Sequence, residues 1–129
     1  MTDFERTATV ASTPDDAFRF LSDPGNLPRY VAMMSAAQPE GRDRLHVAAD
    51  VQGRHEEGDA RFRTDASARR VEWGGEGADG YGGWLQVVAA PAGSRITLHL
   101  HVQHDQDEAE INRTLDETVA NIQRLLGNA

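Results

Sequence analysis

The central part of the chain alternates apolar and polar residues with the two-residue period of half-buried β-strands. Leu45 and Val47, for example, are separated by His46, so the two aliphatic side chains share one face. Further strands are predicted over residues 60–65, 70–73, 84–90 and 96–103. Because the connections between these segments are short, the pattern predicts an antiparallel sheet.

The last segment, residues 105–126, has the period of an amphipathic helix. Asp105 and Glu108 resemble a capping box, and Gly127 is a typical helix stop. Because an isolated helix of this kind is not stable in water, its apolar stripe must lie against the inward face of the sheet. At ~100° per residue the apolar side chains fall on one stripe roughly 120° wide: Ile111, Leu115, Val119, Ile122, Leu125 and Leu126.

The beginning of the chain predicts a strand followed by two short helices. Residues 3–11 alternate loosely. Thr13 is a typical N-cap, and Pro14 suits the first helical position. The Asp-Pro-Gly at residues 23–25 ends this helix, because a residue before proline avoids helical angles. A second short helix or turn is predicted over residues 27–31.

Composition predicts an ordinary globular protein with one domain over residues 1–129. The apolar share is 39% and the charged share is 26%. There are no cysteines, which excludes disulfides, thiolate nucleophiles and cysteine-rich zinc sites. All 13 basic residues are arginine, which excludes Schiff-base chemistry on a lysine.

Charge and hydropathy indicate which classes of partner and which cellular compartment to expect. The formal net charge is −8, and the arginines are scattered along the chain, so a nucleic-acid partner is not expected. No apolar run approaches the ~20 residues that a membrane helix requires. The N-terminal residues lack the basic head and apolar stretch of a signal peptide. We therefore expect a cytoplasmic protein. The sequence leaves its oligomeric state open between a monomer and a homodimer.

Residues 10–24, with the sequence VASTPDDAFRFLSDP, and residues 26–30, with the sequence NLPRY, carry a family resemblance. They resemble the opening of the SRPBCC superfamily, which contains START-related lipid-binding domains and the polyketide cyclase/dehydrase group. The resemblance implies the α+β helix-grip fold. In that fold a curved antiparallel sheet of about seven strands wraps around a long C-terminal helix, with two short helices after the first strand. It also implies a cavity between sheet and helix for a small hydrophobic or aromatic molecule.

The candidate ligand-binding residues are those that this arrangement would place around the cavity. Tyr30, Met33 and Met34 lie where the short helices meet the sheet, which is the usual mouth of the cavity in this superfamily. Phe62, Trp73 and Trp84 would form aromatic walls of the cavity. The glycines before Trp84 obscure the alternation, so the sequence does not decide on which face of the strand Trp84 lies. The full set is Arg6, Tyr30, Met33, Met34, Val47, Phe62, Trp73, Trp84, Leu115, Thr118 and Ile122.

Two of these candidates are polar and each has two interpretations. Thr118 lies near the centre of the apolar helix stripe, and Arg6 shares a strand face with Phe4 and Val10. Either side chain would give a buried ligand an orienting hydrogen bond. The alternatives are that Thr118 bonds to its own helix backbone and that Arg6 extends to solvent.

Motifs for other chemistries are weak. Residues 75–80 match G-x-G-x-x-G, but the residues that follow predict a strand instead of the helix that a dinucleotide site requires. His99 and His101 point the same way, but they lie opposite an apolar row and a zinc site needs a third ligand. G-x-S-x-G is absent. The sequence therefore assigns no catalytic residue, no metal site and no cofactor.

Three functions agree with these residues. The leading hypothesis is the binding of a small hydrophobic or aromatic molecule. The second is a polyketide aromatase/cyclase or dehydratase that uses Arg6, Thr118 or Tyr30 for proton transfer or carbonyl polarisation. The third is a protein-interaction module with a filled core. Convergent polar groups with a perturbed pKa would favour an enzyme, and a carbon-lined cavity would favour binding.

Overall fold

A computed structural model describes residues 2–32, 34–51, 53–75, 82–102 and 108–127. A strand is followed by short helices, six further strands and a long helix. The strands are β1 (Thr2–Val10), β2 (Met34–Pro39), β3 (Arg44–Val51), β4 (Arg54–Asp65), β5 (Arg70–Gly75), β6 (Gly82–Ala90) and β7 (Gly93–Val102). The helices are α1 (Pro14–Leu21), the 3₁₀ turn η1 (Pro24–Asn26), α2 (Leu27–Tyr30) and α3 (Glu108–Leu126).

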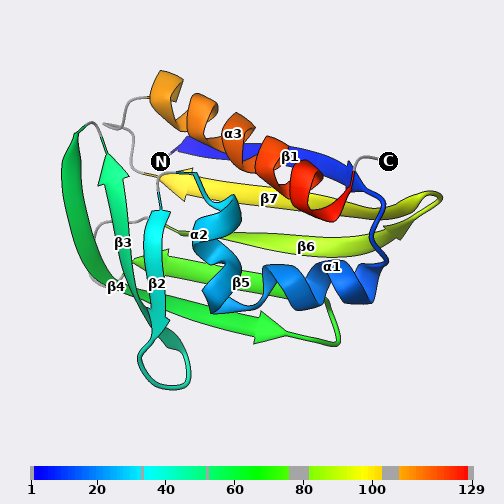
Figure 1. Ribbon diagram of the computed structural model, residues 1–129, viewed down its shortest axis with the longest axis horizontal. Coiled ribbons are helices and arrows are strands. Elements are labelled where there is room, and N and C mark those ends of the chain that lie inside the picture. Colours follow the sequence, from blue (N-terminus) through cyan, green and yellow to red (C-terminus); the bar gives the residue numbers. More distant parts are fainter. Residues whose placement is uncertain (1, 33, 52, 76–81, 103–107, 128–129) are drawn as a thin grey trace.

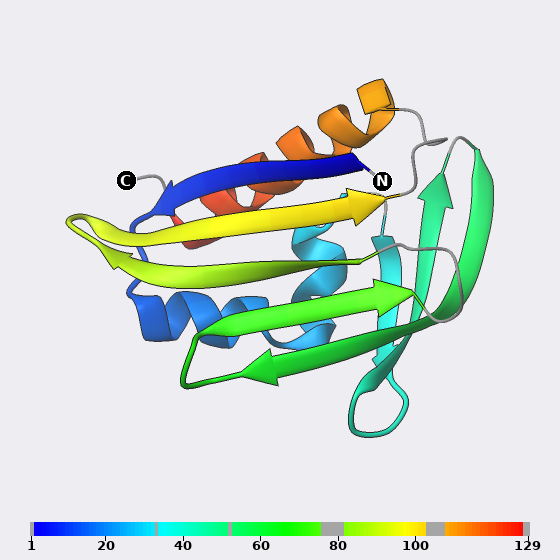
Figure 2. The same cartoon turned by 180° about the vertical axis from the view of Figure 1, so that it is seen from behind.

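The seven strands form one antiparallel sheet in the order β1-β7-β6-β5-β4-β3-β2. All the helices lie on one face of this sheet, called the inner face below, and Figure 2 shows the outer face uncovered by any helix. The long helix α3 runs along β1, while α2 lies beside β2 (Figure 1). This arrangement confirms the predicted helix-grip fold.

The helix boundaries follow from local side-chain bonds. The Thr13 hydroxyl accepts a hydrogen bond from the Asp16 backbone N–H at 3.3 Å, and Pro14 is the first residue of α1. After α1 ends, the Asp23 carboxylate accepts the Gly25 N–H at 2.9 Å and begins η1. The predicted cap, breaker and second short helix are therefore confirmed, with η1 as an additional turn.

The helix α3 is attached at its C-terminal end to the link between β1 and α1. The Leu126 carbonyl accepts hydrogen bonds from the Ser12 N–H at 3.1 Å and the Ser12 hydroxyl at 2.8 Å. Gly127 follows with a φ of 89°, a left-handed conformation that favours glycine. The predicted cap at Asp105 lies outside the described residues. The buried residues of α3 have helical spacing: Leu115, Thr118, Ile122 and Leu126.

The alternation of the strands is confirmed on the central strands and has one exception in β3. Ile96 and Leu98 of β7 are buried on the inner face, as their spacing predicts. Ala48 is also buried, although the alternation assigned it to the polar face. The register of β2 against β3 shifts beside this residue, between Met34 and Ala36, and such a bulge locally changes how the two strands face each other.

Candidate functional site

The centre of the inner face contains a row of large apolar side chains interrupted by Gly83. The register pairs Phe62 of β4 with Trp73 of β5, and Trp73 with Gly83 of β6. Gly83 is paired in turn with Leu100 of β7. A Cβ atom on Gly83 would lie 2.8 Å from Cζ2 of Trp73, so the indole extends over the glycine. The row therefore lacks a side chain at Gly83, a position called the gap below, and the Trp73 indole occupies the space next to the glycine backbone.

Two apolar clusters lie between the sheet and the helices, and the two strand neighbours of Gly83 pack against different clusters. The smaller cluster contains Phe4 and Leu115, with Leu100 and Ile111 packed against it. Trp73 packs against the larger cluster, while Leu100 belongs to the smaller one. The buried members of the larger cluster are Val10, Ala17, Leu21, Leu27, Tyr30, Leu45, Phe62, Val71, Leu85, Val87, Ile96, Leu98, Ile122 and Leu126.

The helix α3 connects the two clusters. Leu115 belongs to the smaller cluster, and Ile122, which is fully buried, belongs to the larger one. Thr118 lies between them along the helix and is 4% exposed. The candidates Leu115, Thr118 and Ile122 are therefore brought to the interior, as the sequence predicted.

Tyr30 is buried in the larger cluster and its hydroxyl is used by the fold. The hydroxyl donates a hydrogen bond to the Leu21 carbonyl at the end of α1, at 2.7 Å. Burial raises the pKa of the Tyr30 phenol well above its ordinary value of 10.0. The phenol is therefore neutral at physiological pH, and its proton is already engaged. Tyr30 connects α1 to α2 instead of presenting a free hydroxyl to a ligand.

Thr118 likewise uses its hydroxyl within the fold. Its Oγ1 donates to the Thr114 carbonyl at 2.9 Å, which is the bond to its own helix that was one of the two interpretations. The same oxygen accepts the Ala32 N–H at 3.0 Å, a contact that the sequence did not predict. Thr118 therefore joins α3 to the segment between α2 and β2.

Arg6 bonds to α3 and does not extend freely into solvent. Its Nε lies 2.9 Å from Oδ1 of Asp116, and its Nη2 lies 2.6 Å from Oδ1 of Asn112. A third nitrogen, Nη1, donates to the Glu5 carbonyl at 3.0 Å. The Arg6 side chain is 28% exposed, so it fastens β1 to α3 at the side of the interior. Both interpretations of Arg6 from the sequence missed these two partners on the helix.

The remaining inner-face candidates lie at the edges of the larger cluster. Met34 and Val47, from β2 and β3, are half-buried and pack against it, as does Trp73. Phe62 is 8% exposed and belongs to the cluster itself. Met33 lies outside the described residues. The described candidates of this group are therefore apolar side chains that belong to or border the larger cluster.

Trp84 is the candidate that the structure places elsewhere, on the outer face of the sheet. Its ring stacks on His99 with centroids 5.3 Å apart and an angle of 9° between the ring planes. The Arg70 guanidinium lies 4.2 Å from the centroid of the Trp84 ring. Leu85, the next residue, is buried on the inner face. The glycines at 82 and 83 carry no side chains, so the alternation that reveals a strand's faces was lost just before Trp84.

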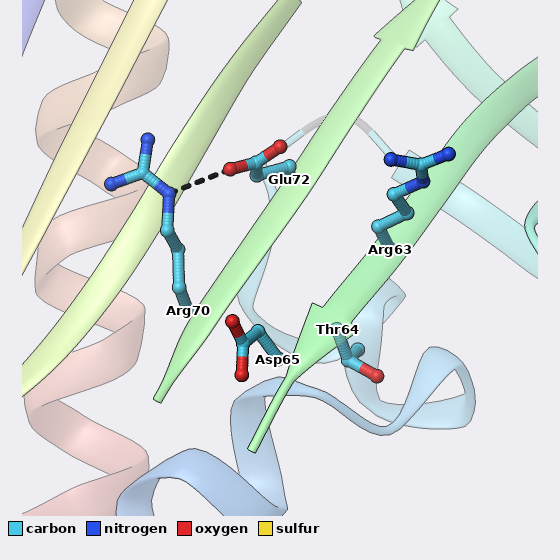
Figure 3. A pocket seen from close by; sticks show the side chains of 5 residues that line it. All are labelled: Arg63, Thr64, Asp65, Arg70 and Glu72. Carbon is cyan, nitrogen blue, oxygen red and sulfur yellow. Dashed lines mark hydrogen bonds and ion pairs between the residues drawn. The ribbon is translucent and has the colours of Figure 1, made fainter. Parts of the chain in front are cut away.

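A pocket of about 220 Å³ includes Arg70 in its lining (Figure 3). On β5, the Arg70 Nε donates to Oε2 of Glu72 at 2.7 Å. Hydrogen bonds from Ser67 lower the pKa of the Asp65 carboxyl. The lining is charged and polar, in contrast to the apolar interior: Arg63, Thr64, Asp65, Arg70 and Glu72.

A second charged group covers the outer part of β3 and β4. His46 contacts Glu57 at 2.8 Å and Asp59 at 3.0 Å. His55 contacts Asp50 at 3.1 Å and Glu57 at 2.8 Å. Hydrogen bonds to Glu57 and Asp59 raise the pKa of His46, and those to Asp50 and Glu57 raise the pKa of His55. Glu57 therefore bridges two imidazoles that hold their protons more tightly than usual.

Sequence comparison places the chain in a family. Residues 1–126 match the family described as polyketide cyclase/dehydrase and lipid transport. The chain therefore belongs to this family, whose members bind small hydrophobic molecules or act as polyketide cyclases. A comparison with curated proteins finds no match. Within the described residues, no helix has the length and apolar character needed to cross a membrane.

Solved structures share the fold at low sequence identity. The Zhui aromatase/cyclase from a Streptomyces species is 16% identical with a TM-score of 0.76, covering 97% of this chain and 93% of that one. A START superfamily protein from Mycobacterium smegmatis is 14% identical with a TM-score of 0.73, over 96% of this chain and 93% of that one. The di-domain ARO/CYC BexL from the BE-7585A biosynthetic pathway is 20% identical with a TM-score of 0.75. The match covers 96% of this chain but only 46% of BexL.

Besides the Ala32 contact of Thr118 and the outer position of Trp84, sequence reasoning missed two further features of the site. The first is Gly83, for which a signal existed, since a glycine inside a strand often marks a close approach of a neighbouring group. The second is the pair of Arg6 partners on α3, Asn112 and Asp116. Both lie on the polar side of the helix pattern, so periodicity gave no reason to connect them with the interior.

Proposed function

We propose that this chain binds a small hydrophobic or aromatic molecule between the inner face of the sheet and α3, at the gap beside Gly83. The observation that supports the proposal is that the apolar interior is divided there into two clusters. Half-buried apolar side chains border the division, with Trp73 on one side and Leu100 and Ile111 on the other. Apolar side chains that remain half-exposed beside a core gain free energy when a ligand covers them.

The chemistry of the lining favours a neutral molecule with a flat apolar part. The Trp73 indole offers a ring for offset or edge contacts with an aromatic ligand. Arg6 is the charged candidate nearest to this interior, and its guanidinium already contacts Asp116 and Asn112. A ligand carrying a charge would lose its hydration there without gaining an ionic partner from Arg6.

A second candidate is an enzyme of the aromatase/cyclase type, and the likeness in fold to Zhui and BexL is the observation that favours it. Such chemistry needs a group that transfers a proton or polarises a carbonyl. Arg6, Tyr30 and Thr118 each hold hydrogen bonds within the protein, so these bonds would have to open first. Binding requires no such change, and for that reason it is the preferred function.

The first experiment is native mass spectrometry of freshly purified protein, to detect a co-purifying small molecule. The second is a fluorescence titration with N-phenyl-1-naphthylamine, a neutral aromatic probe, with the wild type and two matched variants. Leu100→Trp adds bulk at the gap, whereas Val88→Trp adds an indole to a side chain that is 42% exposed on the outer side. Circular dichroism confirms that each variant is folded.

Binding at the gap predicts one probe per chain and an affinity at least about tenfold weaker in Leu100→Trp, with no change in Val88→Trp. Equal probe binding by the wild type and a folded Leu100→Trp variant would remove the site from the interior. A wild type that binds neither probe nor co-purifying molecule would favour the interaction module with a filled core. Conversion of a poly-β-keto substrate to a cyclised product would favour the enzyme.

A further inference from the structure

Two histidines of β7 lie opposite two carboxylates of β1 on the outer face of the sheet. The register places Asp3 opposite His101 and Glu5 opposite His99. Residues two apart on a strand point to the same face, so all four side chains project together. Asp3 Oδ1 lies 3.7 Å from His99 Nε2, and Glu5 Oε2 lies 3.4 Å from His99 Nδ1. The third ligand that the His99–His101 pair lacked in the sequence is thus supplied by the neighbouring strand.

We propose that Asp3, His99 and His101 bind one divalent transition-metal ion, with zinc as the reference ion and Glu5 beside it. Ligand atoms of the first three residues all lie within 4.8 Å of one another. Nitrogen and oxygen ligands bind zinc at about 2.0–2.2 Å, which puts neighbouring ligand atoms roughly 3–4 Å apart. Small side-chain rotations therefore bring these three groups around one ion, and two imidazoles with carboxylate suit such metals.

The surroundings hold the His99 ring in place for this role. One face of the ring stacks on Trp84, and Arg70 lies against the same indole. The nitrogens of His99 lie within 3.7 Å of the carboxylates of β1. The stack therefore restricts the ring while leaving its nitrogen-bearing edge toward the proposed ion, and ligands held by rigid strands bind with less loss of entropy.

The His101 ring has room because residue 82 is glycine. A Cβ atom on Gly82 would lie 3.0 Å from Nε2 of His101 and 3.2 Å from its Cε1. Gly82 is paired with His101 in the sheet and shares the outer face with Trp84. An alanine at position 82 would consequently displace the imidazole from its present position, which makes Gly82→Ala a test of ring placement.

The chain offers a second candidate group, Glu40, His46 and Asp59, which fits less well. Both ring nitrogens of His46 are already at hydrogen-bond distance from carboxylates, at 2.8 Å from Glu57 and 3.0 Å from Asp59. A metal there would have to displace a tightly held proton and break both contacts. The carboxylates lie farther from the ring nitrogens of His99, at 3.4 and 3.7 Å, so a metal would displace weaker contacts there. The proposal therefore concerns the site on β1 and β7.

The proposed ion would connect an edge strand to its only neighbour in the sheet order. β1 is at the edge, pairs with β7, and carries Arg6, which fastens α3. Binding to the folded chain would raise its stability by mass action. The site lies on the face opposite the proposed ligand gap, so either proposal can fail without affecting the other.

The test uses tag-free protein freed of metal with a chelator and titrated with zinc chloride by calorimetry. A second titration with nickel chloride follows tryptophan emission in the Trp73→Phe background, where Trp84 is the remaining one of the chain's 2 tryptophans. We expect one ion per chain and quenching of Trp84. His101→Gln should weaken zinc binding at least about tenfold, and Asp3→Asn and Gly82→Ala should weaken it several-fold. The matched control is the double variant His46→Gln with His55→Gln, which should bind as the wild type does.

Failure of the wild type to bind zinc saturably at one ion per chain would overturn the proposal. It would equally be overturned if the His46/His55 double variant lost binding while His101→Gln kept it. Near-ultraviolet circular dichroism establishes that each variant is folded. If His101→Gln does not fold, Asp3→Asn decides the question, because Asp3 is exposed at the edge strand and its replacement removes charge without changing size.

Discussion

Two buried hydroxyls on the inner side of the sheet and two charged side chains on its outer face bond to different kinds of partner. On the inner side, Tyr30 and Thr118 bond to backbone groups, whose positions are fixed by the fold. On the outer face, His46 and Arg70 bond to other side chains, at carboxylates that are themselves exposed. Backbone partners cannot move away from a buried group, whereas exposed side chains exchange partners with water and ions. The comparison shows that the hydroxyls of Tyr30 and Thr118 serve the fold, while the outer charged groups keep exposed partners that can exchange.

The comparison also separates the two proposals. The inner face offers apolar surface whose polar neighbours are already satisfied, and within the described residues no buried side-chain nitrogen or oxygen lacks a hydrogen-bond partner. The outer face offers charges in pairs that span neighbouring strands. An apolar ligand and a metal ion are therefore expected on different faces of the same sheet.

The largest expected effect comes from removing apolar contact on the inner face. Ile122→Ala empties a fully buried position of α3 and should lower the free energy of unfolding by about 2–5 kcal/mol. The control is Val88→Ala at an exposed position, where we expect a change within about 0.5 kcal/mol. Urea denaturation measures both. Similar decreases in the free energy of unfolding of the two variants would mean that Ile122 of α3 does not pack in the core.

A smaller effect should follow from removing one inner hydrogen-bonding group. Thr118→Val keeps the shape of the side chain but leaves the Ala32 N–H without its acceptor, so stability should fall by about 1–3 kcal/mol. Thr118→Ser retains the oxygen and should lose less than the valine variant. Denaturation curves of the two variants test the order, and a valine variant as stable as the serine one would show that the contact with Ala32 contributes nothing.

The smallest effect concerns pH and the outer group on β3 and β4. The folded-state pKa values of His46 and His55 are raised above the unfolded value, so their stabilisation is complete below about pH 6.5. It is lost as the pH rises through the folded pKa values. The hydrogen bond with His46 is the largest cause that lowers the pKa of Glu57 and of Asp59. The contribution of these two carboxylates to stability is therefore lost as the pH falls through their lowered pKa values.

The measurement is the melting temperature at about pH 6 and about pH 9 for the wild type and the His46→Gln, His55→Gln double variant. The wild type should lose more stability than the double variant over this interval. The difference is expected to be small because all the partners are exposed. Equal pH dependence in the two proteins would show that the imidazoles do not favour the folded state.

Much of the fold was predictable because it depends on local rules. The Thr13 cap with Pro14 is a matter of a few neighbouring residues, and the stripe of α3 depends on periodicity within one segment. The inner position of Ile122 and Trp73 followed from the same patterns. The position of Trp84 did not, because two glycines precede it and a residue without a side chain carries no information about the face of a strand.

The sequence by itself therefore determined the order of elements, the apolar faces and the family resemblance, since each is encoded in residues close together along the chain. Only the tertiary structure decided the partners of Arg6, the gap at Gly83 and the meeting of Asp3 with His99. These contacts join residues far apart in the chain, and they depend on which strands are neighbours and in which register. Register is a property of the assembled sheet, because a shift of one residue would exchange its two faces.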